Sequence, residues 1–365
     1  ADIVSQGGMG EFDAVALEKK LAGKLVSIQS WIGNVDEEIG GRAAPADLET
    51  LMQLIYLKFT APRKDTTAFQ AYRSRLETML ANRSASPRAV YQDSLMVTLA
   101  QHHPRVRPWN MSMLDDLDLN RSMEIYRDRF ADASDFMFIF VGNIDLEKLR
   151  PLAETYLGGL PSLRTEETWR DVGVRPPNGV VRKDVVKGME PQSRVQLIFT
   201  GDFIWNRQNR YDIVSMASAF QIKLREILRE DLGGTYGVGV NASPTLIPAA
   251  RYQLSIGFGC DPERVEELIK TVFTQIDSLK STGLDQSYID KVGEMQRRDH
   301  ETSLKENGYW LSLLRRSYTY REDPLNVLQF ERLLESLTVE SIRAAANRYF
   351  DTDNYIRMVL LPEEP

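Results

Sequence analysis

The stretch Leu228-Arg-Glu-Asp-Leu-Gly-Gly-Thr-Tyr236-Gly-Val joins a long predicted helix to a predicted strand. It places Arg229 in the last turn of that helix, and Tyr236 follows seven residues later at the start of the strand. The pair Gly233-Gly234 lies between them, and glycines permit a sharp bend because they carry no Cβ atom. We therefore expect the bend to bring the guanidinium of Arg229 and the hydroxyl of Tyr236 together.

The elements around this bend predict a domain that mixes helices and strands. The helix before it covers residues 206–229 and carries apolar side chains along one side. Short apolar runs rich in β-forming residues predict strands at 180–186, 193–199, 235–241, 251–258 and 355–361. The spacing of apolar residues predicts further helices near 262–280, 285–305, 325–334 and 339–349.

The first half of the chain reads mostly as helix. Helical segments are predicted at 48–59, 66–81, 87–99 and 120–130, and a short helix capped by Asp145 runs to Tyr156. The continuous apolar run Phe136-Met-Phe-Ile-Phe-Val141 predicts a buried strand. Prolines and charged residues gather between 161 and 179, so we interpret that segment as a linker between two domains.

The sequence contains an internal repeat. Arg129-Phe-Ala-Asp132-Ala-Ser-Asp-Phe136 and Arg348-Tyr-Phe-Asp351-Thr-Asp-Asn-Tyr355 stand at an offset of 219 residues, and each leads into an apolar run. A repeat of this length predicts two units of similar fold. The same offset projects the opening strand of the second copy to a position before residue 1. We therefore expect the first copy to lack its opening strands and the chain to be a piece of a longer protein.

Composition excludes several classes of protein. The 365 residues include 42% hydrophobic and 27% charged residues, which is typical of a folded globular chain. Lys and Arg number 45 against 52 Asp and Glu, and this net charge of −7 argues against a general nucleic-acid binder. The single cysteine, Cys260, cannot form an intramolecular disulfide. No run approaches the ~18–20 apolar residues of a membrane-spanning helix, so no transmembrane segment is predicted.

Five strings of residues, spread over nearly the whole chain, match the motifs of one protein family. The arginine–tyrosine stretch that ends at Val238 is the string in the second half. The four strings in the first half are His103-Pro104, Tyr126-Arg-Asp-Arg-Phe130, Phe140-Val-Gly-Asn-Ile-Asp145 and Tyr156-Leu-Gly-Gly-Leu-Pro161. On these strings nearly the whole chain resembles the insulinase/pitrilysin family of zinc metallopeptidases. The resemblance implies an α+β fold of two tandem repeats, each a mainly antiparallel sheet covered by helices. The implied domains are 1–170, lacking its opening strands, and 180–365, which carries the Arg/Tyr motif.

The resemblance also implies a function. The chain is similar to the carboxy-terminal half of a bacterial family member, which would close a peptide chamber around a polypeptide substrate. Zinc would then belong to the full-length protein and be held by its amino-terminal half, the implied partner. The histidines of this chain, His102, His103 and His300, lack the spacing of a catalytic zinc site, so we expect no metal here and an isolated chain without activity. The bacterial periplasm or cell envelope is favoured over the cytoplasm.

Three residues are candidates for substrate contacts. Hydrolysis of an amide builds negative charge on the scissile carbonyl oxygen, which a tyrosine hydroxyl can stabilise, so Tyr236 is the expected oxyanion-side donor. Arg229 is the expected substrate clamp, because its donors can hold peptide carbonyls. Gly237 leaves room for another backbone to approach. The alternative for Arg229 is a purely structural role in which it satisfies carbonyls at the helix end.

Two other functions remain open on the sequence. A non-catalytic binding or scaffold protein of the same fold is the main alternative, since the fold serves that purpose in respiratory-complex core proteins. An unrelated α+β ligand-binding protein is the third interpretation.

Overall fold

The structure is a computed structural model that describes residues 1–165, 167–235 and 237–363, with the backbone but not the side chain of residue 231. The chain divides into two compact units, and each is described separately below. Unit 1 comprises residues 1–82 and 109–170, and unit 2 comprises residues 83–108 and 171–365. The predicted first domain ran without interruption to residue 170, whereas segment 83–108 belongs to unit 2.

Unit 2 contains a five-stranded sheet in the order β3-β7-β4-β6-β5. All neighbouring strands are antiparallel except β3 and β7, so the sheet is mainly antiparallel as expected. The strands are β3 (Val181–Val186), β4 (Ser193–Asp202), β5 (Val238–Thr245), β6 (Arg251–Cys260) and β7 (Tyr355–Leu361). The alternation of buried and exposed residues along β6 shows that one face of the sheet meets a core.

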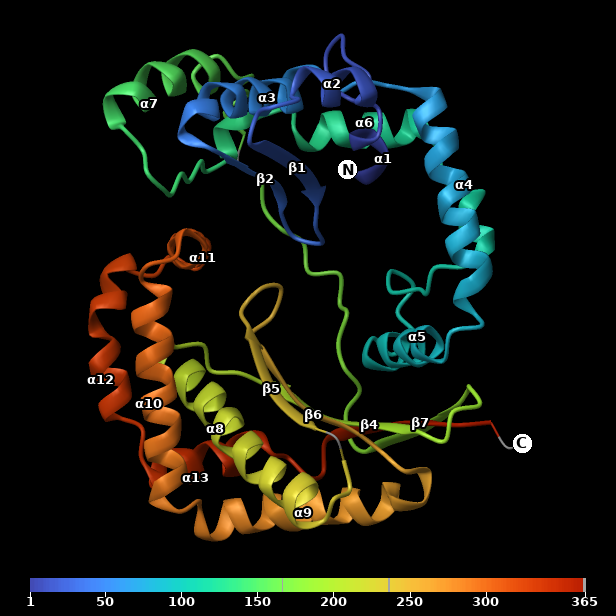
Figure 1. Cartoon of the computed structure of the whole chain (residues 1–365), viewed down its shortest axis with the longest axis vertical. Coiled ribbons are helices and arrows are strands. Elements are labelled where there is room, and N and C mark those ends of the chain that lie inside the picture. The colour runs from blue at the N-terminus through green and yellow to red at the C-terminus, as the bar shows by residue number, and fades with distance from the viewer. Residues whose placement is uncertain (166, 236, 364–365) are drawn as a thin grey trace. The chain divides into compact units, whose positions relative to one another are not determined.

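Helices cover both faces of this sheet, as Figure 1 shows. The larger core joins one face to α8 (Arg207–Arg225), α9 (Val265–Thr282) and α13 (Val339–Tyr349). A smaller core on the other face is built by α5 (Pro87–Leu99), whose Tyr91 and Leu95 pack against Ile198 of β4 and Met358 of β7. Segment 83–108 therefore belongs to unit 2 because it buries its apolar side there.

The remaining helices of unit 2 lie in its last third. Helix α10 (Gln286–Ser303) packs on α8 and α12, and α11 follows it directly. The sequence patterns did not predict α11, whose exposed surface weakens the apolar period. The other bounds are α11 (Asn307–Thr319), η7 (Pro324–Gln329) and α12 (Phe330–Glu335).

Unit 1 is mostly helical, and its core centres on α3 (Leu48–Thr60) and α6 (Leu119–Arg129). A two-stranded antiparallel hairpin packs against α3. This hairpin was not predicted, since Gly40 and Gly41 interrupt the alternation of its second strand. The remaining bounds are α1 (Asp2–Ser5), α2 (Ala14–Lys20), β1 (Val26–Ile32), β2 (Glu37–Ala43), α4 (Thr66–Arg83) and α7 (Leu146–Leu152).

The predicted strand at 136–141 is wrong. Its residues take no strand assignment, although Phe136, Phe138 and Phe140 pack against the core of unit 1. The corresponding strand of the repeat, β7, is bonded on both sides, to β3 and to β4. Among the described residues no strand lies beside 136–141, and an apolar run without a bonded neighbour does not complete a sheet.

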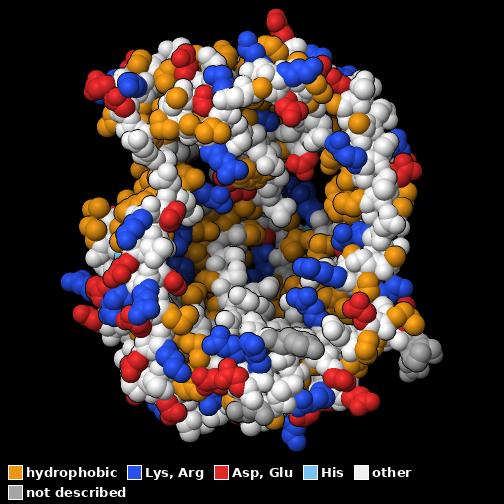
Figure 2. All heavy atoms as spheres, viewed as in Figure 1, with side chains coloured by type: hydrophobic (Ala, Val, Ile, Leu, Met, Phe, Trp, Pro, Cys, Tyr) orange, Lys and Arg blue, Asp and Glu red, His pale blue; other side chains and the backbone are white. Residues whose placement is uncertain are grey.

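Charged side chains of both signs are interspersed over the face drawn in Figure 2.

Candidate functional site

The candidate site begins where α8 leaves regular helical geometry. Residues Glu226–Asp231 form the π-helical turn η5, and the N–H of Leu232 donates to the carbonyl of Ile227 at 3.0 Å. A π turn adds one residue to a helical turn and so rotates the side chains that follow it. Leu228 is fully buried beneath this turn, whereas Arg229 is exposed. The turn therefore directs the side chain of Arg229 away from the core.

The guanidinium of Arg229 has no hydrogen-bond or ion-pair partner among the described residues. An arginine with a purely structural role at a helix end would donate to the last carbonyls of that helix. Arg225 lies one turn earlier on the same helix and is also exposed, so it provides an internal comparison.

Two glycines make the bend that the sequence predicted, each for a different reason. Gly233 has a φ of +57°, a backbone conformation that disfavours other residues. Gly234 lies against α9, where an added Cβ atom would be 2.7 Å from Cδ2 of Leu268. Arg264, at the start of α9, donates to the carbonyl of Leu232 at 3.1 Å. The first turn of α9 thus holds the bend in place.

Thr235 holds the backbone just beyond the bend. Its hydroxyl donates to the carbonyl of Gly237 at 2.9 Å and accepts from the N–H of Gly237 at 3.1 Å. Gly237 itself is exposed, and no atom lies within 4 Å of the position that a Cβ atom would take. Tyr236 falls outside the described residues, so its predicted meeting with Arg229 stays a prediction.

Strand β5 follows the bend and forms one of the two edge strands of the sheet. Residues 239, 241, 243 and 245 alternate with the buried Val240 and so lie on the face away from α8, where residue 239 is a glycine and the other three are exposed. The matching residues of β6 on that face include Gln253, Ser255 and Gly257. The part of this face formed by β5 and β6 is therefore polar and glycine-containing, while α5 covers the part nearer β7.

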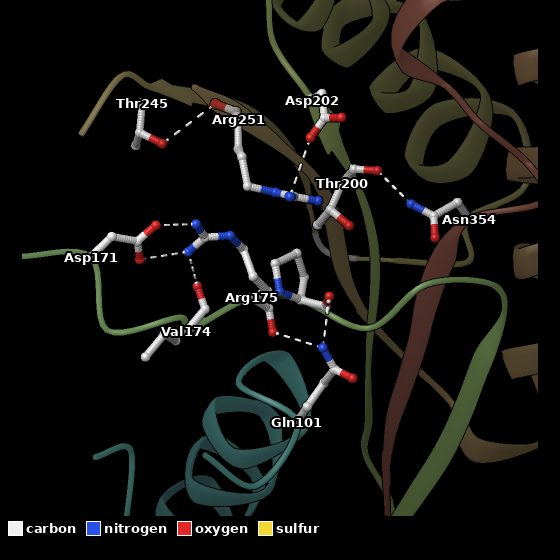
Figure 3. Close-up of polar contacts among 10 residues, drawn as sticks. Gln101, Asp171, Val174, Arg175, Thr200, Asp202, Thr245, Arg251 and Asn354 are labelled. Carbon is white, nitrogen blue, oxygen red and sulfur yellow. Dashed lines mark hydrogen bonds and ion pairs between the residues drawn. The ribbon is translucent and has the colours of Figure 1, made fainter. Parts of the chain in front are cut away.

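Segment 171–176 is tied to the end of α5 within unit 2, as Figure 3 shows. Gln101 donates to the carbonyls of Arg175 and Pro176 at 3.2 and 3.1 Å. Arg175 forms an ion pair with Asp171, and nearby Arg251 pairs with Asp202 at 3.2 Å. The predicted linker thus contains no helix or strand in this part but is held by side-chain contacts.

Comparison with known proteins finds similarity to zinc proteases of one family. Residues 119–294 match the model of the "Peptidase M16 inactive domain". The "Probable zinc protease PqqL" of Haemophilus influenzae is 24% identical over 95% of this chain and 37% of its own length. This chain is therefore similar to M16 peptidases. This confirms the resemblance to insulinase-type zinc metallopeptidases.

Solved M16 structures share the fold of this chain. The periplasmic protease PqqL from Escherichia coli superposes with a TM-score of 0.85 at 20% identity, over 99% of this chain and 40% of that one. A peptidase M16 inactive domain from Pseudomonas fluorescens superposes with a TM-score of 0.78 at 17% identity, over 100% of this chain and 87% of that one. The predicted α+β fold is therefore confirmed, and the division into two tandem repeats stays a prediction. The chain spans about two fifths of the curated relatives that it matches.

The histidines of this chain do not form a zinc site. His103 donates from Nε2 to the carbonyl of Val172 at 3.0 Å, because its Nδ1 atom accepts from the N–H of Arg105 at 3.2 Å. His300 stacks on Phe330 with ring centroids 4.0 Å apart, and burial lowers the pKa of its imidazole. The described part of the chain holds no group of three His, Cys, Asp or Glu side chains suited to a metal ion. These residues do not fit zinc.

No described helix of this chain is both long and apolar enough to cross a membrane.

Proposed function

We propose that this chain is the zinc-free, carboxy-terminal half of an M16 zinc metalloendopeptidase and that it contributes to binding the polypeptide substrate. The family and the match to its inactive domain support this assignment. The partner would be the amino-terminal half of the same protein, which would hold the metal. A relative from Escherichia coli is a periplasmic protease, and we extend that compartment to this chain.

The observation that carries the proposal is the exposed, unpaired guanidinium of Arg229 at the entry to an outer strand. A guanidinium without a protein partner is available to the carbonyl groups of an extended peptide. Strand β5, which begins one residue after Gly237, offers backbone groups to the same peptide. Arg229 would then clamp the peptide, and the open space beside Gly237 would admit its backbone.

Tyr236 would act on the scissile peptide group. The carbonyl oxygen of that group gains negative charge as the peptide bond is attacked. A phenol hydroxyl that donates to this oxygen stabilises the charged state more than the starting peptide, and so it raises kcat rather than affinity. This role requires the hydroxyl and not the ring.

The experiment compares the full-length protein with its Tyr236→Phe variant on a quenched fluorescent peptide. Loss of one such donor costs about a hundredfold to a thousandfold in kcat, while KM should change little. An unchanged kcat in a correctly folded variant would exclude Tyr236 from the reaction. Peptide binding without any cleavage by the zinc-loaded full-length protein would instead support the scaffold alternative.

A further inference from the structure

The outer edge of β5 is interrupted by a side chain from α8. The N–H of Val240 donates to Oε1 of Gln221 at 2.9 Å. A residue in an antiparallel pair directs its N–H either to its partner strand or away from it. Since this N–H bonds to a helix side chain, Val240 belongs to the set of β5 residues whose backbone groups face away from β6.

The alternation along β5 then fixes which other groups face outward. Val238 and Ala242 stand two residues before and after Val240, so their N–H groups also face the outer edge. Pro244 falls on the same set and has no N–H, which agrees with the preference of proline for the outer side of an edge strand. No described side chain bonds to the N–H of Val238 or of Ala242. Gln221 therefore divides an otherwise open edge.

We propose that Gln221 is a positioning residue that limits strand addition along β5 and sets the register of a bound polypeptide. The occupant is an extended polypeptide segment, and this inference rests on the proposed peptide-binding function. Its backbone can form a hydrogen-bonded pair with Val238, next to Gly237, but Gln221 blocks the next such pair at Val240. The peptide is thereby held at the first residues of β5, next to Gly237 and the bend at Gly233-Gly234.

The chemistry of residue 221 makes the proposal testable. Only the side-chain oxygen of Gln221 is used at Val240, so a glutamate can replace it as the acceptor. Gln221→Glu therefore keeps the hydrogen bond to the N–H of Val240, whereas Gln221→Ala removes this bond and exposes the N–H. Ser218→Ala is the matched control on α8, since the Ser218 hydroxyl bonds only to the carbonyl of Val214 in its own helix.

The experiment uses the whole chain and a fluorescein-labelled peptide of about ten residues that alternates valine and serine. Fluorescence anisotropy gives the affinity, and amide hydrogen exchange reports the N–H of Val240 in each variant. We expect Gln221→Ala to lose protection at Val240 and to bind the peptide about threefold to tenfold more tightly, the effect of one added hydrogen-bonded pair. Gln221→Glu and Ser218→Ala should bind the peptide as the native chain does.

A peptide series with single backbone N-methyl groups locates the register. Binding to Gln221→Ala should be sensitive to methylation at one additional peptide position compared with binding to the native chain. That additional position should lie two residues from the nearest position that is sensitive in both proteins. Equal affinity of Gln221→Ala and the native chain would overturn the role of Gln221 and leave the proposed function standing. Failure of every variant to bind the peptide would overturn both, and the Tyr236→Phe measurement tests the proposed function independently.

Discussion

The Nζ atom of Lys58 lies 3.4 Å from the hydroxyl oxygen of Ser30, and both side chains are buried in unit 1. Lys58 also donates to the hydroxyl of Ser5 at 3.2 Å, and no carboxylate of the described residues pairs with it. A buried ammonium held only by hydroxyl groups favours its neutral form. Burial accordingly lowers the pKa of Lys58 to about 8 from an ordinary value of 10.5.

Lys58 should make the stability of unit 1 rise with pH in the alkaline range. Between pH 8 and 10.5 the unfolded lysine keeps its proton while the folded lysine has lost it, so a rise in pH favours folding. The pKa shift corresponds to a destabilisation of the folded state by about 3 kcal/mol. This destabilisation is fully present below pH 8 and disappears above the ordinary pKa of lysine. Lys58→Met should therefore be more stable than the native chain at pH 7.

Urea unfolding of the native chain and Lys58→Met at pH 7, 8, 9 and 10 measures this difference. The difference in the free energy of unfolding between the two proteins should decrease as the pH rises. Lys64→Met is the control, since Lys64 is exposed, and it should follow the native chain. A gap that stays constant from pH 7 to 10 would contradict the prediction.

Asp132 should be far more important to the fold than its repeat counterpart Asp351. The carboxylate of Asp132 is buried and accepts from the backbone and hydroxyl of both Ser134 and Thr165, and from the N–H of Leu163. These donors hold the pKa of Asp132 well below its usual range. The carboxylate of Asp351 accepts from the N–H of Asp353 at 3.0 Å.

Asp132→Asn replaces one acceptor oxygen with a donor that faces other donors. We expect its melting temperature to fall more than that of Asp351→Asn, with earlier proteolysis near residue 163. Because the pKa of Asp132 is depressed, its contribution is present at neutral pH and is lost in strong acid. Thermal melts at pH 7 with limited proteolysis test this, and equal melting temperatures would count against it.

An added methyl group should lower stability at Gly234 but not at Gly237. Alanine at 234 would place Cβ 2.7 Å from the buried Leu268, and such overpacking costs about 1–3 kcal/mol. Alanine at 237 meets no atom within 4 Å and should leave stability unchanged. If a peptide passes beside Gly237, however, Gly237→Ala should raise KM of the full-length protein. Chemical unfolding and peptide kinetics on the same two variants separate these effects.

Arg229→Ala should weaken peptide binding, whereas Arg225→Ala should not. Both guanidinium groups are exposed on one helix, so general attraction of an acidic peptide would be reduced equally by either change. A specific clamp loses charge-assisted hydrogen bonds only at Arg229, which should raise KM about tenfold. Both variants should melt like the native chain. Equal effects of the two substitutions on KM would argue against a clamp at Arg229.

Local patterns in the sequence anticipated most helices of this chain. The helix at 87–99 and the strand at 355–361 were predicted with the bounds that the structure has, because a cap or a dense apolar run marks each of their ends. The bend at Gly233-Gly234 was predicted for the same reason, since a positive φ is a local requirement. Helix α11 and the hairpin β1–β2 were not predicted, as their apolar patterns are weak.

Contacts between segments distant in sequence could not be predicted from local patterns. The run 136–141 has the composition of a strand, yet strand formation requires a bonded neighbour, which lies outside any local window. The candidate site likewise contains residues that local patterns identify and one that they do not. Arg229 and the glycine bend are visible in the sequence, whereas a glutamine within a helix carries no signal for a bond to an edge strand.

The residues alone thus specify the resemblance to zinc metallopeptidases, the order of most helices and strands, and the bend that presents Arg229, since each depends on neighbours in sequence. Packing in three dimensions adds the α5 contribution to unit 2, the isolation of Lys58 from carboxylates and the Gln221 cap on Val240. These arise when segments distant in sequence bury surface and satisfy backbone groups together, which no single segment encodes.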